Sequence, residues 1–220
     1  EEAIASSQLE GANTTRKYAK KIIREGIKPR TKSEHMIVNN YIAMNRIEDD
    51  YQNKKLSIEL LYEMHEQITK NTIPTEDLRR LRNDKDAIVV LHNEHTVAFE
   101  PPQEKVLKRE LDRFIKFSNN ELGHSFIHPV IKAIIIHFWF AYLHPFVDGN
   151  GRMARLLFYW YLIKAGYWGF AYLPISAIIK KSRISYEKAF IYTEQDDNDL
   201  TYFIDYNLAK IKQALSEFQN

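Results

Sequence analysis

One segment of this chain, residues 127–143, is apolar on nearly every side of a helix. A helix of that kind has no polar face to turn toward water, so it is expected to be buried. Its longest apolar run, Ala133 to Leu143, is too short to cross a bilayer and is interrupted by His137. The segment therefore predicts a central buried helix, which delivers the next residue, His144, to a site at its end.

The stretch after this helix, His144 to Arg155, reads His-Pro-Phe-Val-Asp-Gly-Asn-Gly-Arg-Met-Ala-Arg. Gly149 and Gly151 allow a tight turn that points backbone N–H groups toward an anion, and the helical pattern that follows adds the positive end of its dipole. Arg152 and Arg155 lie three positions apart, so they share a helix face on which guanidinium groups can pair with phosphate oxygens. The pattern predicts a phosphate-binding site.

Two further side chains add chemistry to this site. Asp148 is a hard oxygen ligand of the kind that magnesium uses together with substrate phosphates, and His144 can accept a proton near neutral pH. Other glycine-rich motifs do not match. The acidic residue of a dinucleotide-binding fold is missing, and so is the Lys-Ser or Lys-Thr pair of a P-loop. Arg152 stands where a calcium-binding loop needs an oxygen ligand. The residues predict a site that grips a triphosphate and deprotonates a nucleophile.

The same stretch resembles the signature of the Fic family, His-x-Phe-x-(Asp/Glu)-Gly-Asn-Gly-Arg-x-x-Arg, and fills every fixed position. The resemblance implies an all-α Fic fold, with a helical core around a central signature helix and a short β-hairpin flap. It also implies a protein adenylyltransferase, which moves AMP from ATP to a Ser, Thr or Tyr hydroxyl of a target protein. Doc-type kinases of the family carry Ala-Asn-Lys in place of Gly-Asn-Gly, so the glycines argue against that reaction.

The resemblance also implies a role for each signature residue. His144 removes the proton of the acceptor hydroxyl, which attacks the α-phosphorus of ATP. Asp148 holds the Mg²⁺ ion that neutralises phosphate charge. Arg152 balances the departing phosphates, and Arg155 places the γ-phosphate. The ATP-binding residues are then Gly149, Asn150, Gly151, Arg152 and Arg155.

A second motif, Ser6-x-x-x-Glu10-Gly11, lies near the N-terminus. Ser6 and Glu10 are four positions apart and face one side of a short helix, predicted over 2–11, which Gly11 is well placed to end. The motif resembles the inhibitory sequence Ser/Thr-x-x-x-Glu-Gly/Asn of Fic proteins that carry it before the core. In those proteins the glutamate pairs with the second signature arginine, here Arg155, and blocks the γ-phosphate. The resemblance therefore predicts an autoinhibited enzyme.

One region departs from the helical pattern. Two β-prone runs flank a polar turn within 88–99, which predicts a hairpin. One interpretation is a small structural ribbon. The resemblance instead implies the flap, which holds the target polypeptide by strand-like pairing. The edge of a ribbon offers the unpaired N–H and C=O groups that such pairing needs. The candidate target-binding residues are Val89, Val90, Leu91, Thr96 and Val97.

Length and charge fit one enzyme domain. A chain of 220 residues with 45% hydrophobic content can bury a sizeable core, so 1–220 is expected to form a single domain. The net charge of +2 is spread among both signs, so no nucleic-acid partner and no membrane association is expected. Absence of cysteine fits a reducing, cytoplasmic location. A homo-oligomeric state stays open.

Only 7 glycines, 7 prolines and long 3.6-residue periodicities predict a mostly helical chain. The predicted helices span 2–10, 14–25, 32–51, 57–71, 103–119, 127–143, 150–165, 183–194 and 198–217.

Several other residues invite a functional interpretation. His137 is expected to be a buried core histidine, and Arg79, Arg80 and Arg82 a solvated charged loop. Tyr186 lies roughly where family members present an aromatic ring to adenine. Two alternative functions stay open at this stage. One is removal of AMP from a modified target, with Glu10 positioning water; the other is a non-catalytic module that senses ATP.

Overall fold

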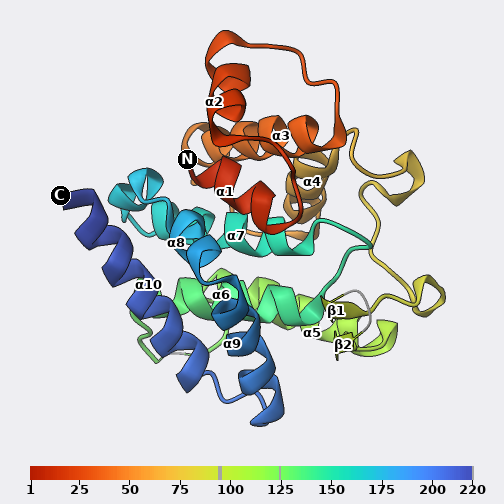
Figure 1. Ribbon diagram of the computed structural model, residues 1–220. Coiled ribbons are helices and arrows are strands. Elements are labelled where there is room, and N and C mark those ends of the chain that lie inside the picture. Colours follow the sequence, from red (N-terminus) through yellow and green to blue (C-terminus); the bar gives the residue numbers. More distant parts are fainter. Residues whose placement is uncertain (94–95, 124, 220) are drawn as a thin grey trace.

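The computed structural model describes residues 1–93, 96–123 and 125–219, and its regular structure is almost entirely helical (Figure 1). The all-α prediction is confirmed. The helices are α1 (Glu2–Leu9), α2 (Arg16–Glu25), α3 (Lys32–Arg46), α4 (Ile58–Thr69), α5 (Glu104–Ser118), α6 (Pro129–Leu143), α7 (Asn150–Lys164), α8 (Ile175–Lys181), α9 (Arg183–Gln195) and α10 (Thr201–Gln219).

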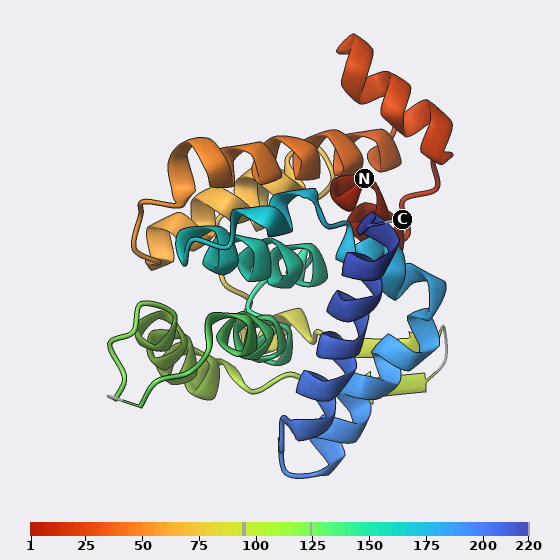
Figure 2. The same cartoon turned by 90° about the vertical axis from the view of Figure 1, so that its left-hand side faces the viewer.

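Helix α7 is the centre of the molecule. Every one of its residues from Arg152 to Ile163 is buried. Helices α3 and α4 lie on one side of it and α6 on the other, with α5 beyond α6, while α8, α9 and α10 close one flank (Figure 2). Helix α6 is less enclosed than its sequence predicts, because Trp139 and Tyr142 stay half-buried. The helix that is surrounded on all sides is therefore the one that begins inside the signature.

Polar caps fix where the first helices begin. The hydroxyl groups of Thr15, Thr31 and Ser57 each accept a hydrogen bond from a backbone N–H in the first turn of α2, α3 and α4. Gly26 ends α2 in the left-handed conformation, with φ of 63°. These signals are local, so the predicted starts of the three helices agree with the structure to within two residues.

The core is rich in aromatic side chains. His137 lies among them, 3% exposed, with Nε2 2.8 Å from the Tyr186 hydroxyl and the rings of Phe190 and Phe203 around it. Burial lowers the pKa of His137 to about 3, so the ring is neutral. It is the core histidine that the sequence predicts. Its partner Tyr186 is also buried, on α9.

The predicted hairpin is present as β1 (Val90–Asn93) and β2 (Thr96–Phe99), an antiparallel pair with an irregular register. Val89, just before β1, is 42% exposed. Glu94 and His95 in the turn lie outside the described residues. So do the side chains of 91–98, which include the candidate target contacts Leu91, Thr96 and Val97.

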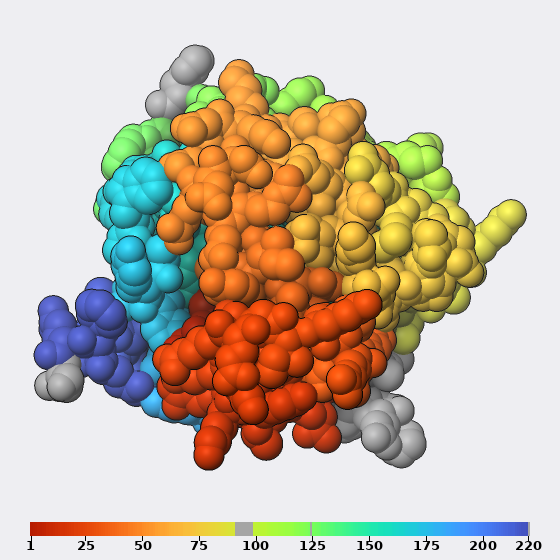
Figure 3. Space-filling view, turned by 90° about the horizontal axis from the view of Figure 1, so that it is seen from above, coloured from red at the N-terminus to blue at the C-terminus, as the bar shows by residue number. Residues whose placement is uncertain are grey.

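Some elements were not predicted. Helix α8 has only 7 residues, too few for periodicity to reveal. Residues Ile47–Tyr51 continue α3 as a π-helical turn, and short 3₁₀ turns occupy Thr75–Asp77, Asp84–Asp86 and Trp168–Tyr172. Helix α2 lies at the surface alongside α3 (Figure 3). Within the described ranges, no helix combines the length and the apolar character that crossing a membrane requires.

Candidate active site

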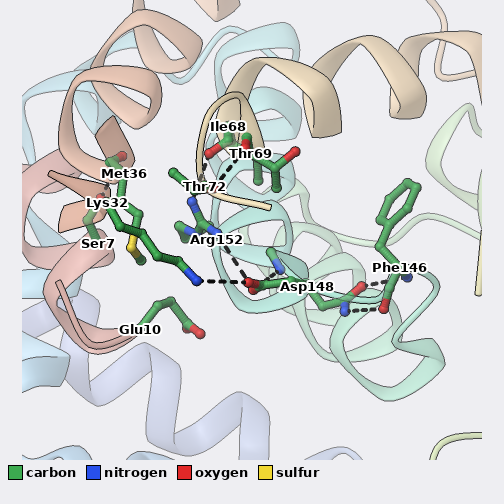
Figure 4. A network of polar contacts seen from close by, with 12 residues as sticks. Ser7, Glu10, Lys32, Met36, Ile68, Thr69, Thr72, Phe146, Asp148 and Arg152 are labelled. Carbon is green, nitrogen blue, oxygen red and sulfur yellow. Dashed lines mark hydrogen bonds and ion pairs between the residues drawn. The ribbon is translucent and has the colours of Figure 1, made fainter. Parts of the chain in front are cut away.

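The loop that joins α6 to α7 is closed by its own residues. The Asn150 side chain accepts a hydrogen bond from Phe146 N at 2.9 Å and donates one to Phe146 O at 2.8 Å (Figure 4). Gly149 adopts φ of 87°, and a Cβ there would lie 2.7 Å from Cγ2 of Thr69, so only glycine fits. The Asn150 amide is therefore engaged within the loop.

The carboxylate of Glu10 lies over the first turn of α7. A Cβ added at Gly151 would clash with Glu10 Oε1, so the glycine leaves the room that the carboxylate fills. Arg155 Nη2 donates to the same oxygen at 2.8 Å. A helix N-terminus and a guanidinium group both favour an anion. An internal anion thus occupies the place where the sequence predicts a phosphate.

Ser6 and Glu10 hold the Arg155 guanidinium together. Arg155 Nε donates to Ser6 Oγ at 2.8 Å, and Nη2 donates to Ser6 O at 3.0 Å. Arg155 is 4% exposed, whereas the Glu10 side chain is 35% exposed. Burial raises the pKa of Glu10, but the attraction of Arg155, helped by Arg152, outweighs it and the pKa is lowered. The four-residue spacing of the motif is explained because both Ser6 and Glu10 contact the same arginine.

Helix α1 is packed on several sides, which fixes Glu10. Ser7 Oγ donates to Met36 O at 3.1 Å, and Asn40 Nδ2 donates to Ala3 O at 3.2 Å, which tie α1 to α3. The Glu2 carboxylate accepts hydrogen bonds from the backbone N–H and hydroxyl of Ser176 on α8. The helix ends at Leu9, within the predicted segment 2–11 and one residue short of the helical range 2–10, and Gly11 follows with φ of 88°. Glu10 therefore projects from a firmly held element.

His144 ends α6 in the left-handed conformation, with φ of 46° and ψ of 56°. Its Nδ1 lies 3.3 Å from Ala141 O. Because a carbonyl only accepts, Nδ1 carries the proton and Nε2 presents a lone pair. Burial lowers the pKa of His144 to about 4, so the ring is neutral at pH 7.

His144 opens onto a cavity of about 200 Å³. The cavity brings together the N-terminal motif, the signature, the hairpin and α9. Its lining includes Glu10, His144, Gly151, Arg155, Val90, Phe99, Tyr186, Phe190 and Glu194. The predicted base, the arginine and the inhibitory carboxylate therefore border one space, with aromatic side chains at its α9 wall.

The Arg152 and Asp148 side chains approach each other at the start of α7 (Figure 4). Arg152 is 1% exposed; its Nη1 donates to Ile68 O at 2.7 Å, and its Nε has no hydrogen-bond partner among the described residues. The Asp148 carboxylate is 47% exposed and lies 3.7 Å from Arg152 Nη2 and 3.8 Å from Lys32 Nζ. Asp148 Oδ1 also accepts a hydrogen bond from Gly149 N, and the half-exposed carboxylate keeps lone pairs for a further cation. The unpaired Arg152 Nε–H is buried.

Sequence reasoning missed two residues that support the loop. His65 stacks on Phe146 with ring centroids 3.8 Å apart, and its Nε2 lies 3.0 Å from Asp148 O. A histidine on the apolar face of a predicted helix was the only available signal. Arg82 was expected in a solvated loop, and this is wrong: it is 5% exposed and its side chain donates to backbone carbonyl groups, including His144 O.

The two neighbouring arginines behave as the sequence predicts. Arg79 pairs with Glu66 at 3.0 Å, and Arg80 pairs with Asp77 and Asp86, all at the surface or partly exposed. The structure thus separates three arginines that look equivalent in the sequence.

Comparison with known proteins agrees with this geometry. The Fic/DOC family model matches residues 55–162. A relative named Protein adenylyltransferase Fic from Drosophila willistoni is 30% identical over 182 residues, which are 81% of this chain and 33% of the relative. The relative of the same name from Drosophila ananassae is 32% identical over 135 residues, 61% of this chain and 24% of the relative. This chain belongs to the Fic/DOC family.

Solved structures share the fold. A Fic family protein from Desulfovibrio desulfuricans G20 superposes with a TM-score of 0.78 at 22% identity, covering 97% of this chain and 62% of that one. Fic-1 from C. elegans gives 0.71 at 19% identity, covering 99% of this chain and 62% of the other. The chain spans between a quarter and a third of the two curated relatives, 24% and 33%.

Proposed function

We propose that this chain is a protein adenylyltransferase whose resting state is inhibited by Glu10, and that residues 1–220 act as one domain. ATP is the substrate, and a Ser, Thr or Tyr hydroxyl of a target protein is the acceptor. One observation carries the proposal: the Glu10 carboxylate lies on Arg155 and above Gly151 at the first turn of α7. A site that binds this carboxylate has the donors that bind a phosphate.

His144 is the proposed general base. His144 borders the shared cavity, and its Nε2 lone pair takes the proton of the acceptor hydroxyl, whose oxygen forms a bond to the α-phosphorus. The bond from that phosphorus to the β-phosphate bridge breaks, pyrophosphate leaves, and AMP stays on the target. Backbone N–H groups at Gly149 and Gly151 stabilise the oxygens of the α-phosphate as charge shifts; for this the Gly149 N–H exchanges its present acceptor, Asp148 Oδ1, for a phosphate oxygen. Arg152 balances the departing phosphates with the charge of its guanidinium group.

Asp148 fits the role of magnesium ligand. Its carboxylate is half-exposed, supplies hard oxygen atoms and lies beside the proposed phosphate site. No group of three metal-ligating side chains occurs among the described residues, so phosphate oxygens and water must supply the remaining ligands. The ion would neutralise phosphate charge when ATP is bound.

Inhibition follows from competition between two anions for Arg155. With Glu10 in place, the γ-phosphate finds the guanidinium occupied and an anion in its way. ATP then binds with its α-phosphorus away from the line of attack, and a displacement of about 1 Å lowers the rate on the order of 100-fold.

The hairpin is the proposed binding site of the target, since Val90 of β1 and His144 border the same cavity.

Removal of AMP is the second candidate, because Glu10 and His144 border the same cavity and the carboxylate is 35% exposed. A carboxylate there is placed to orient water toward a bound AMP. The two activities differ in their need for Glu10: addition is blocked by it, and removal depends on it.

The test is mass spectrometry of lysate proteins incubated with ATP and the Glu10→Gly variant. We expect target peptides to gain an adenylyl group, and the matched Glu10→Gly/His144→Ala double variant to add none, because only the base differs. The modified proteins are then incubated with the wild type; loss of AMP there, and not with Glu10→Gly, assigns removal as well. If Glu10→Gly adds no adenylyl group to any protein, the adenylyltransferase proposal is wrong.

A further inference from the structure

The buried Arg82 side chain gathers three carbonyl groups from two segments of the chain. Its Nε donates to His144 O at 2.7 Å, and its Nη2 donates to Leu143 O at 3.2 Å and Pro102 O at 2.6 Å. Its backbone N–H donates to Pro145 O at 2.9 Å. No carboxylate lies within ion-pair distance of it in the part of the chain that the structure describes. The guanidinium is therefore used as a set of hydrogen-bond donors to backbone.

These bonds meet a specific need at the end of α6. The last carbonyl groups of a helix have no partner inside it, and the residue after Leu143 is left-handed, a conformation that glycine usually supplies. His144 has a Cβ, so its φ of 46° is strained. The strain persists only where surrounding contacts hold it. Arg82 supplies those contacts on the carbonyl side of the turn.

The direction of the His144 ring depends on this turn. The ring leaves the backbone at the left-handed residue, and its one hydrogen bond among the described residues, from Nδ1 to Ala141 O, is long at 3.3 Å. The backbone, more than the ring bond, therefore sets where Nε2 points. A rotation of the peptide groups on either side of His144 would carry Nε2 away from the cavity.

We propose that Arg82 is a positioning residue for the reaction: it locks the left-handed turn at His144 so that the base faces the cavity, and it ties this turn to the chain leaving the hairpin at Pro102. The inference rests on the proposed adenylyl transfer. It adds a coupling between the segment that holds the target and the residue that deprotonates it.

The charge of Arg82 also acts on the base. Burial is the largest cause that lowers the pKa of His144, and Arg82 lowers it further, while the Ala141 carbonyl, Glu10 and Asp148 raise it. Replacing Arg82 with a neutral residue therefore raises the pKa of His144. Since the neutral ring is the active form, the acid limb of the rate profile moves to higher pH.

The experiment compares Arg82→Met and Arg82→Lys, each in the Glu10→Gly background. We expect Arg82→Met to lower kcat on the order of 100-fold, as misplacement by about 1 Å does, with KM for ATP changed less than about threefold because the phosphate site is untouched. Its acid limb moves up in pH. Arg82→Lys keeps the charge, so its acid limb stays in place, while its single ammonium group restores only part of kcat. Arg79→Met is the control, with kcat unchanged.

Folding is checked by the stoichiometry of ATP binding, and if Arg82→Met does not fold, Arg82→Lys carries the test. A second readout does not need activity: ¹⁵N NMR of the His144 ring, which shows one tautomer in the parent and a mixture in Arg82→Lys. The positioning role is overturned if kcat of Arg82→Met stays within threefold of the Glu10→Gly parent. It is also overturned if the ring spectrum of Arg82→Lys is the same as that of the parent. Absence of transfer by the Glu10→Gly parent instead counts against the proposed function, and the ring spectrum then decides the role of Arg82 alone.

Discussion

Replacement of Glu10 by glycine raises the rate of AMP transfer at least tenfold over the wild type. The change removes the carboxylate that lies 2.8 Å from Arg155 Nη2 and clears the space above Gly151. A tenfold gain corresponds to about 1.4 kcal/mol, less than the roughly 2–5 kcal/mol attached to truncating a buried charge pair. The smaller figure suits Glu10, since 35% of its side chain is exposed. Autolabelling with α-labelled ATP measures the rate.

Two variants separate the carboxylate from the helix that carries it. Glu10→Gln keeps a similar shape without the charge, and we expect an intermediate gain. Gln8→Ala changes a neighbouring side chain, favours the same helix and keeps Glu10, so its labelling stays near the wild-type rate. Equal labelling by the wild type and Glu10→Gly argues against the inhibitory role.

Loss of the His144 imidazole abolishes transfer and retains nucleotide binding. A positioned general base contributes about 10²–10⁴-fold, so His144→Ala in the Glu10→Gly background is expected to fall at least about 100-fold in kcat. His144→Asn gives the same result and tolerates the left-handed backbone at φ of 46° better than alanine does. The measurements are AMP transfer and ATP affinity by calorimetry.

The pH profile supplies an independent check on the same residue. The pKa of His144 is about 4 through burial, and Glu10 raises it, so Glu10→Gly lowers it further. Transfer by Glu10→Gly is then expected to fall only below about pH 4. His128→Ala, at the other end of α6, leaves the rate unchanged because that ring contacts Tyr167. Substantial transfer by His144→Ala would contradict its role as base.

Much of the site was predictable because it is local in the sequence. The loop and the first turn of α7 lie within one stretch of sequence. Local backbone geometry is therefore enough to predict the turn at the glycines and the helix face that carries the arginines. The contact between Glu10 and Arg155 joins residues 145 positions apart. No periodicity predicts a contact at that separation; a resemblance to a motif was needed.

The parts that were missed depend on backbone carbonyl groups brought in from remote segments. Arg82 reads as one of three arginines in a polar loop, and its partners Leu143 and Pro102 come from different elements. His65 binds a carbonyl 83 residues away. Side-chain type predicts an interaction, but only the fold determines which partner is used.

The central claim is that Glu10 and the γ-phosphate compete for Arg155. The most direct measurement is the ratio of the dissociation constants of ADP and ATP, by isothermal titration calorimetry, for the wild type and Glu10→Gly. The account predicts a ratio near one for the wild type, where the third phosphate finds no free guanidinium, and at least about tenfold tighter binding of ATP by Glu10→Gly, since a charge-assisted pair to Arg155 is gained. The same ratio in both proteins would contradict it.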